Sequence, residues 1–185
     1  PYLRIDYVIE TADGFERTLL MWATAAANNR IIEVLLGRKA NVDAGNSVGG
    51  TALQLACQDG HLECVGQLLN ANASPNLGMR DGTAPLHRAC SAGHLDVAKA
   101  LLASGASVDV ADKRGRTSLH MACQSGNERA ARLLLSSGSA VNRSDRDGAS
   151  PLLQSCDLPV LRYGIVDLLV RSQANVNQVG GAHMS

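Results

Sequence analysis

Two kinds of apolar block alternate along the chain, separated by polar stretches that contain glycine. The first kind carries small apolar residues, such as Ala56 with Cys57 or Ala89 with Cys90, and glycine follows it. The second kind carries leucine pairs. Glycine after such a block is typical of a helix end, where the backbone turns with positive φ. The pattern therefore predicts paired short helices, with close approach between helices of the first kind and leucines filling the layer between units.

These blocks repeat at a fixed interval of 33 residues. Residues 51–61 (TALQLACQDGH) recur at 84–94 (APLHRACSAGH) and at 117–127 (TSLHMACQSGN). Residues 18–23 and 150–156 fit the same register, which makes five copies. A sustained period of this length is the signature of a repeat architecture, in which no single unit buries its apolar face alone.

Polar residues at fixed places in the unit have local structural roles. A good N-cap, whose hydroxyl accepts from an otherwise unpaired amide of the first turn, precedes the first helix at Thr18, Thr51, Thr117 and Ser150. Pro85 and Pro151 then occupy the first helical position, where a missing N–H costs nothing. Ala84 departs from this pattern at the cap. Residues 112–115 and 145–148 supply turn residues for a hairpin between units.

At these residues the chain resembles the ankyrin-repeat family, whose unit of about 33 residues contains a T-P-L-H-x-A signature. The resemblance covers residues 13–185 and implies an all-α solenoid of stacked helix-turn-helix units with hairpin loops between them. The implied repeats span about 13–45, 46–78, 79–111, 112–144 and 145–179. The fifth contains two inserted residues, which we place in the turn 157–164.

The two ends of the chain lie outside these five repeats. Residues 1–12 lack the helix pattern, and we expect them to be either an atypical cap or the remnant of a preceding repeat. Residues 178–185 are similar to an inter-repeat loop that reaches a cap position at Ser185. We therefore expect a sixth repeat to begin there, and the chain to be a piece of a longer protein.

Composition and charge narrow the class of partner. The chain is 45% hydrophobic and 18% charged, with one Trp and one Phe, which favours helices packed through small and medium side chains. Its formal net charge is zero and no aromatic platform is interleaved with basic residues, so no nucleic-acid partner is expected. No apolar run approaches the roughly 20 residues that cross a bilayer, and residues 1–10 lack a signal-peptide pattern. We expect a cytoplasmic or nuclear protein without a membrane partner.

Cysteine is the residue type that most suggests chemistry. It recurs every 33 residues at Cys57, Cys90, Cys123 and Cys156. Equivalent helices of neighbouring repeats pack about 8–10 Å apart, whereas a disulfide needs Cα atoms within about 7 Å. Metal ligands would have to converge on one point instead of following an axis. We therefore expect these cysteines, and Cys64, to be reduced core residues, with no metal and no cofactor.

Histidine gives no catalytic pattern either. His87 and His120 lie in the signature, and His61 and His94 follow the helix-ending glycine; the family resemblance implies that such residues form hydrogen bonds around the loops. No Ser, His and Asp set stands apart from the repeat, and no phosphate-binding loop is present. We expect neither an enzyme nor a small-molecule substrate.

The resemblance implies that a partner protein binds on the concave face, at positions that the repeat leaves free. These are the hairpin tips, the two residues before the helix-ending glycine, and one position inside each first helix, where Leu55 also lies. We expect the partner-binding residues to be Trp22, Ser47, Val48, Gln58, Asp59, Arg80, Asp81, Arg88, Lys113, Arg114, Arg116, Met121, Gln124, Ser125, Arg146 and Asp147. Trp22, Arg88 and Met121 are expected to be partly exposed.

Charge is uneven over this set. Between Arg80 and Arg146 there are 10 basic and 6 acidic residues. Such a cluster would steer an acidic or phosphorylated segment into the groove. The alternative is a solvated face that keeps the stack soluble.

Three functions remain open on sequence grounds. The first is a protein-interaction module that acts as a scaffold or inhibitor. The second is the substrate-recognition part of a cullin-type ubiquitin-ligase receptor, because residues 56–65, 150–153 and 175–178 look similar to members of the ankyrin-repeat and SOCS-box family. Its C-terminal box would lie outside this chain. The third is a regulatory arm of a larger enzyme or channel.

Overall fold

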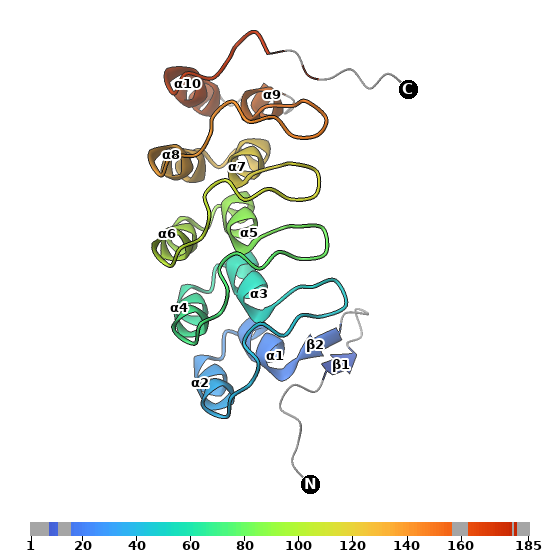
Figure 1. The fold of residues 1–185 in the computed structure, drawn as a ribbon. Helices are drawn as coiled ribbons and strands as arrows, with labels where there is room; N and C mark the ends of the chain where they lie inside the picture. Colours follow the sequence, from blue (N-terminus) through green and yellow to red (C-terminus); the bar gives the residue numbers. More distant parts are fainter. Residues whose placement is uncertain (1–7, 11–15, 157–162, 179, 181–185) are drawn as a thin grey trace.

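The computed structural model describes residues 8–10, 16–156, 163–178 and 180, which form a stack of helix pairs (Figure 1). The inner helix of each pair lies beside the projecting hairpins, and the outer helix lies on the opposite side of the stack (Figure 1). The inner helices are α1 (Leu19–Ala25), α3 (Ala52–Asp59), α5 (Pro85–Ala92), α7 (Ser118–Ser125) and α9 (Pro151–Cys156). The outer helices are α2 (Asn29–Gly37), α4 (Leu62–Asn70), α6 (Leu95–Ala103), α8 (Glu128–Ser136) and α10 (Tyr163–Arg171).

Each helix packs against its counterparts in the neighbouring units, so one core runs along the stack. On the inner helices, Ala56, Ala89 and Ala122 are fully buried, which confirms the expected close approach of these helices. On the outer helices, Leu68 and Leu101 are fully buried and fill the space between layers. The predicted all-α solenoid is confirmed, and its stability comes from interfaces between neighbouring units.

The inner helices end as predicted. Gly60, Gly93 and Gly126 follow α3, α5 and α7 with φ of +77°, +79° and +72°. The turn after an outer helix also needs a left-handed residue. Gly105 and Gly138 supply it in two units, whereas the equivalent positions 39, 72 and 173 hold Lys, Asn and Gln at positive φ.

The expected N-caps form at several helix starts. The hydroxyl oxygens of Thr18, Thr51 and Ser150 accept from the amides of Met21 (3.2 Å), Gln54 (3.3 Å) and Leu153 (3.3 Å). Thr117 differs, because its hydroxyl lies 2.9 Å from Nδ1 of His120. Histidine thus takes part in forming this helix start.

A short antiparallel sheet precedes the first helix and is the one strand pair in the described residues. Strands β1 (Val8–Glu10) and β2 (Glu16–Thr18) pair with Val8 opposite Thr18. Figure 1 shows them on the side of α1 from which the hairpins project at later units. Residues 8–10, predicted to belong to an end segment without a helix, thus belong to a first hairpin.

The predicted core position of the cysteines is confirmed at four residues and wrong at one. Cys57, Cys64, Cys90 and Cys123 are buried and free. Burial raises the pKa of the thiols of Cys90 and Cys123 to about 12. Cys156 is exposed, because among the described residues no inner helix lies beyond α9 to cover it.

The inner helix of the fifth unit is described only as far as Cys156. The predicted insertion at 157–164 falls largely outside the described residues, which resume at Tyr163. The predicted start of a sixth repeat at Ser185 also lies outside them.

Candidate functional site

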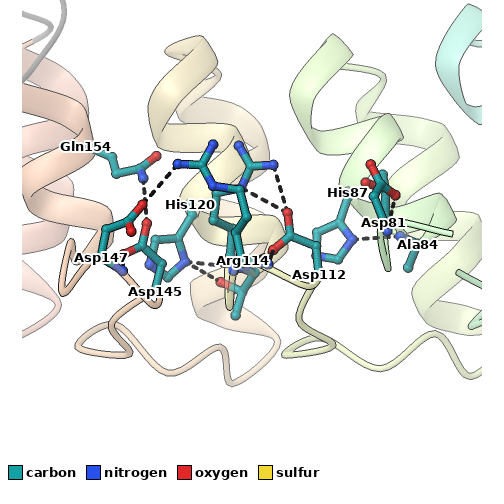
Figure 2. A network of polar contacts seen from close by, with 12 residues as sticks. Asp81, Ala84, His87, Asp112, Arg114, His120, Asp145, Asp147 and Gln154 are labelled. Carbon is teal, nitrogen blue, oxygen red and sulfur yellow. Dashed lines mark hydrogen bonds and ion pairs between the residues drawn. The ribbon is translucent and has the colours of Figure 1, made fainter. Parts of the chain in front are cut away.

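Three of the described hairpins are each closed by one side chain at the base, from Asn46, Asp112 or Asp145. Oδ1 of Asp112 accepts from the amides of Arg114 (2.9 Å) and Arg116 (2.9 Å). Asp145 makes the same pair of bonds two and four residues on, at 3.0 and 2.9 Å, and Asn46 does so at 3.1 and 2.8 Å. Figure 2 shows Asp112 and Asp145 in this network. The hairpins are therefore held in one conformation before any partner binds.

The signature histidines connect each helix start to the following loop. Nδ1 of His87 accepts the amide proton of Ala84 (2.8 Å), so Nε2 carries the ring proton and donates it to Val110 O (3.0 Å). His120 repeats this arrangement with Thr117 N (3.1 Å) and Ala149 O (3.2 Å). Burial lowers the pKa of both imidazoles. The rings are structural, as expected from the sequence.

Neighbouring hairpin tips are joined by main-chain hydrogen bonds. These bonds run from Arg80 N to Val48 O (2.9 Å), from Lys113 N to Asp81 O (2.8 Å) and from Arg146 N to Arg114 O (2.8 Å). Glycine permits this approach: a Cβ at Gly82, where φ is +83°, would lie 2.9 Å from Lys113 N. The tips therefore form a continuous row in which each repeats the geometry of the last.

The structure brings the predicted tip residues together in this row. Ser47, Val48, Arg80, Asp81, Lys113, Arg114, Arg146 and Asp147 are all turn residues at the ends of hairpins. Arg114 and Asp147 form an ion pair across neighbouring tips (3.0 Å), visible in Figure 2. Arg116 is not part of the row, which corrects the expectation of a free basic tip. Its side chain is 19% exposed and is held by Asp112 at 2.8 Å.

A hollow of about 260 Å³ lies between the first hairpins and the inner helices α3 and α5. Its lining includes Val48 and Met79 from hairpins, Leu55 and Gln58 from α3, and Arg88 from α5. We call this hollow, with the adjoining exposed residues of the inner helices, the groove. Most of its accessible lining is apolar, but Arg88 carries a positive charge into it.

Arg88 lines the hollow that defines the groove. It donates to Oε1 of Gln58 (2.8 Å) and approaches the sulfur of Met79 (3.1 Å). It also lines a second hollow, of about 200 Å³, with Asp81, Ser91 and Met121. The guanidinium is therefore fixed between two recesses and remains partly accessible from both.

Trp22 lies at the N-terminal end of the groove. It is 43% exposed, as the sequence analysis expected. The guanidinium of Arg17, which lines the larger hollow, lies 5.6 Å from its ring centre. A cation over an aromatic face is an attractive arrangement. This end of the groove therefore presents an exposed aromatic surface beside a positive charge.

Met121 does not behave as expected. It is only 8% exposed, because its helix α7 packs between α5 and α9, and it lines the smaller hollow. The expectation of partial exposure is therefore wrong for Met121. Asp59 and Gln124 are exposed near the ends of their helices, and Ser125 is half-buried, 3.0 Å from the hydroxyl of Ser91.

Several groove residues were missed by the sequence analysis. Arg17, Asn46, Gln54 and Met79 line the larger hollow but were not among the predicted residues. Met79 carried a signal, since it stands where the neighbouring hairpins have Asn46, Asp112 and Asp145. A residue other than Asn or Asp at this position does not close the hairpin, so its side chain is available for another role.

The described residues contain no group of three or more His, Cys, Asp or Glu side chains arranged to hold a metal ion. None of the helices in that part of the chain is long and apolar enough to span a bilayer.

Comparison with known proteins identifies the repeat. The family described as ankyrin repeats (3 copies) matches residues 20–112 and 104–179, which together cover most of the chain. No curated protein matched the chain. Members of this family are in general binding modules and not enzymes. The chain therefore belongs to the ankyrin-repeat family, whose repeats form protein–protein interaction modules.

Proposed function

We propose that this chain binds a partner protein on the groove and the row of hairpin tips, and so acts as a scaffold or inhibitor. The observation that carries the proposal is the exposed Trp22 beside Arg17, which lines a hollow together with Val48, Leu55, Met79 and Arg88. Tryptophan and arginine are enriched among the residues that dominate binding energy, especially beside a pocket.

The tips give this surface a preference for acidic partners. Arg80, Lys113 and Arg146 are exposed along one edge of the groove, and Arg88 lies inside it. Positive charges placed this way raise the rate of encounter with an acidic or phosphorylated segment. The ubiquitin-ligase receptor and the regulatory arm stay predictions, and no contact in the structure favours either over a general interaction module.

The test is quantitative affinity capture from cell extract with a groove variant, Trp22→Ala with Arg88→Ala. A matched control replaces exposed residues of the outer helices, Val34→Ala with Arg129→Ala. We expect the groove variant to lose proteins that the wild type and the control both retain, because truncating such anchors typically costs about 2 kcal/mol or more. Circular dichroism checks that both variants fold.

Arg116 is left unchanged in this design, since its loss would leave the carboxylate of Asp112 buried without its ion-pair partner. If the groove variant and the control retain the same proteins in the same amounts as the wild type, the groove is not the binding face.

A further inference from the structure

Three cations stand in line along the hairpin tips. Arg80, Lys113 and Arg146 are each 33 residues apart and occupy the same position of the turn. Each donates its backbone amide to a carbonyl of the preceding tip, at 2.8 to 2.9 Å. The three Cα positions are therefore related by the repeat itself, and the side chains leave the backbone from equivalent places. We call these residues the cation row.

Carboxylates on the hairpins that carry the cation row are occupied by other groups. Asp112 is held by Arg116 and by two amides, and Asp147 by Arg114. Burial acts to raise the pKa of Asp81, but bonds from Thr83 and the charge of Arg88 outweigh it, so the pKa lies below its ordinary value. Asp81 is therefore ionised, and all three acids are already engaged.

The cations themselves remain available. All three are exposed, and within the described part of the chain none of their side chains forms an ion pair or hydrogen bond. Exposed and unpaired cations keep most of their capacity to attract an anion from solution. The row therefore presents three like charges whose spacing is fixed by the stack.

The distance between neighbouring cations of the row matches the repeat of a polyproline II segment. Units of the stack repeat at the packing distance of neighbouring helices, about 8–10 Å. A polyproline II segment rises about 3.1 Å per residue with 3 residues per turn, so every third side chain lies on the same face about 9 Å further on. A β-strand turns alternate side chains to opposite faces and does not present every third residue to one side.

We propose that the cation row binds an acidic segment of a partner protein in polyproline II conformation, with Asp or Glu at every third residue. This inference rests on the proposed function and adds the chemistry and the period of the partner. The three carboxylates would pair with Arg80, Lys113 and Arg146, and the segment would run along the edge of the groove.

The experiment measures fluorescence anisotropy of dye-labelled peptides with the whole chain. The periodic peptide has four Glu-Pro-Pro units, and the clustered peptide has the same composition with its glutamates consecutive. We expect the periodic peptide to bind about tenfold more tightly, since it can form three exposed ion pairs at once. Its binding should weaken as salt is raised, because exposed charges are screened.

Two variants locate the binding. Replacement of the cation row by glutamine (Arg80→Gln, Lys113→Gln, Arg146→Gln) should abolish the preference for the periodic peptide. A control with the same loss of charge (Arg30→Gln, Arg38→Gln, Arg129→Gln) changes exposed cations away from the tips and should keep it.

Each of several results would overturn the inference: equal affinity for the two peptides, no binding of either, or unchanged binding by the row variant. A single-stranded oligonucleotide of equal charge that bound the row as tightly as the periodic peptide would overturn it too. If the peptides fail while the groove variant still loses its captured proteins, the proposed function stands and only the acidic period is wrong.

Discussion

Gln54 takes the place that His87 and His120 occupy in the next two repeats. Its Nε2 donates to Leu77 O (3.0 Å) and Thr83 O (2.8 Å), as a protonated imidazole nitrogen would. Its Oε1 stands in for Nδ1, but it is buried and has no hydrogen-bond partner in the described residues. A buried acceptor left unpaired costs about 1–3 kcal/mol.

Replacing Gln54 by histidine should therefore stabilise the protein. We expect Gln54→His to raise the free energy of unfolding by about 1 kcal/mol, because Nδ1 would accept the amide proton of Thr51. Urea unfolding followed by circular dichroism measures the change. His87→Gln is the reciprocal control and should lower stability by a similar amount. A loss of stability in Gln54→His would show that the amide is the better fit in this repeat.

The two buried histidines also predict how stability depends on pH. Burial lowers the pKa of His87 and His120 in the folded state, although the charge of Asp112 opposes part of the shift. The unfolded chain binds protons first, near the ordinary histidine pKa of about 6.5. Their contribution is therefore fully present above that pH and is lost as pH falls through the window below it.

We expect the free energy of unfolding to fall between pH 7 and pH 5, and to fall less in the double variant His87→Gln with His120→Gln. Glutamine offers the same donor without titrating, as Gln54 already does. Denaturant titrations at the two pH values give the comparison. Equal pH dependence in wild type and variant would mean that other groups carry it.

At the scale of the element, glycine is required at one position of the fold and is replaceable at another. Gly82 has a φ of +83° and a space closed by the next tip, whereas a Cβ at Gly66 in α4 would meet nothing within 4 Å. We expect Gly82→Ala to cost about 1–3 kcal/mol through backbone strain and contact with Lys113. Gly66→Ala should stabilise by about 0.4–1 kcal/mol, since alanine favours helix.

Thermal or urea unfolding of the two variants measures the expected loss of stability in Gly82→Ala and the expected gain in Gly66→Ala. Gly66→Ala serves as the control for the added methyl group. If Gly82→Ala proved neutral, the hairpins would have enough freedom to move apart, which would contradict the fixed row of tips.

Helices and their ends were predictable because local chemistry decides them. Thr51 caps α3 and Gly60 ends it through contacts within a few residues of each. The exposure of Met121 and Cys156 was not predictable in this way, because neighbouring units decide it. Met121 occupies the same position of the repeat as the half-buried Arg88. Its side chain is apolar and is buried, whereas that of Arg88 is partly exposed.

The location of the groove could be predicted from the sequence, but the full set of residues that line it could not. The tips and inner helices could be assigned from the repeat register, and Trp22 and Arg88 were found that way. Arg17 and Met79 were missed, since their role depends on side-chain contacts with Trp22 and Arg88, which the register of the repeat does not contain. The pairing of Arg114 with Asp147 likewise needed the distance between tips, which composition does not contain.

For the whole molecule, stability should vary along the stack. Helices α5 and α7 pack on a neighbour at each side, whereas α9 and α10 have described neighbours on one side. We expect amide hydrogen exchange to be slowest in α5 and α7 and faster at both ends of the described stack, in α1, α2, α9 and α10, because local opening is easiest where fewest interfaces break. Hydrogen exchange with mass spectrometry reads this out. Uniform exchange would indicate a single cooperative unit.

The main-chain hydrogen bonds between neighbouring tips do not involve the side chains at the tips. Atoms common to every amino acid except proline set the distance from one tip to the next, and the side chains at 47, 80, 113 and 146 are absent from those bonds. Any of these side chains can be exchanged without moving its neighbours. The partner of such a surface is open to change by substitutions that leave folding unaltered, so related chains can share this geometry and bind different proteins.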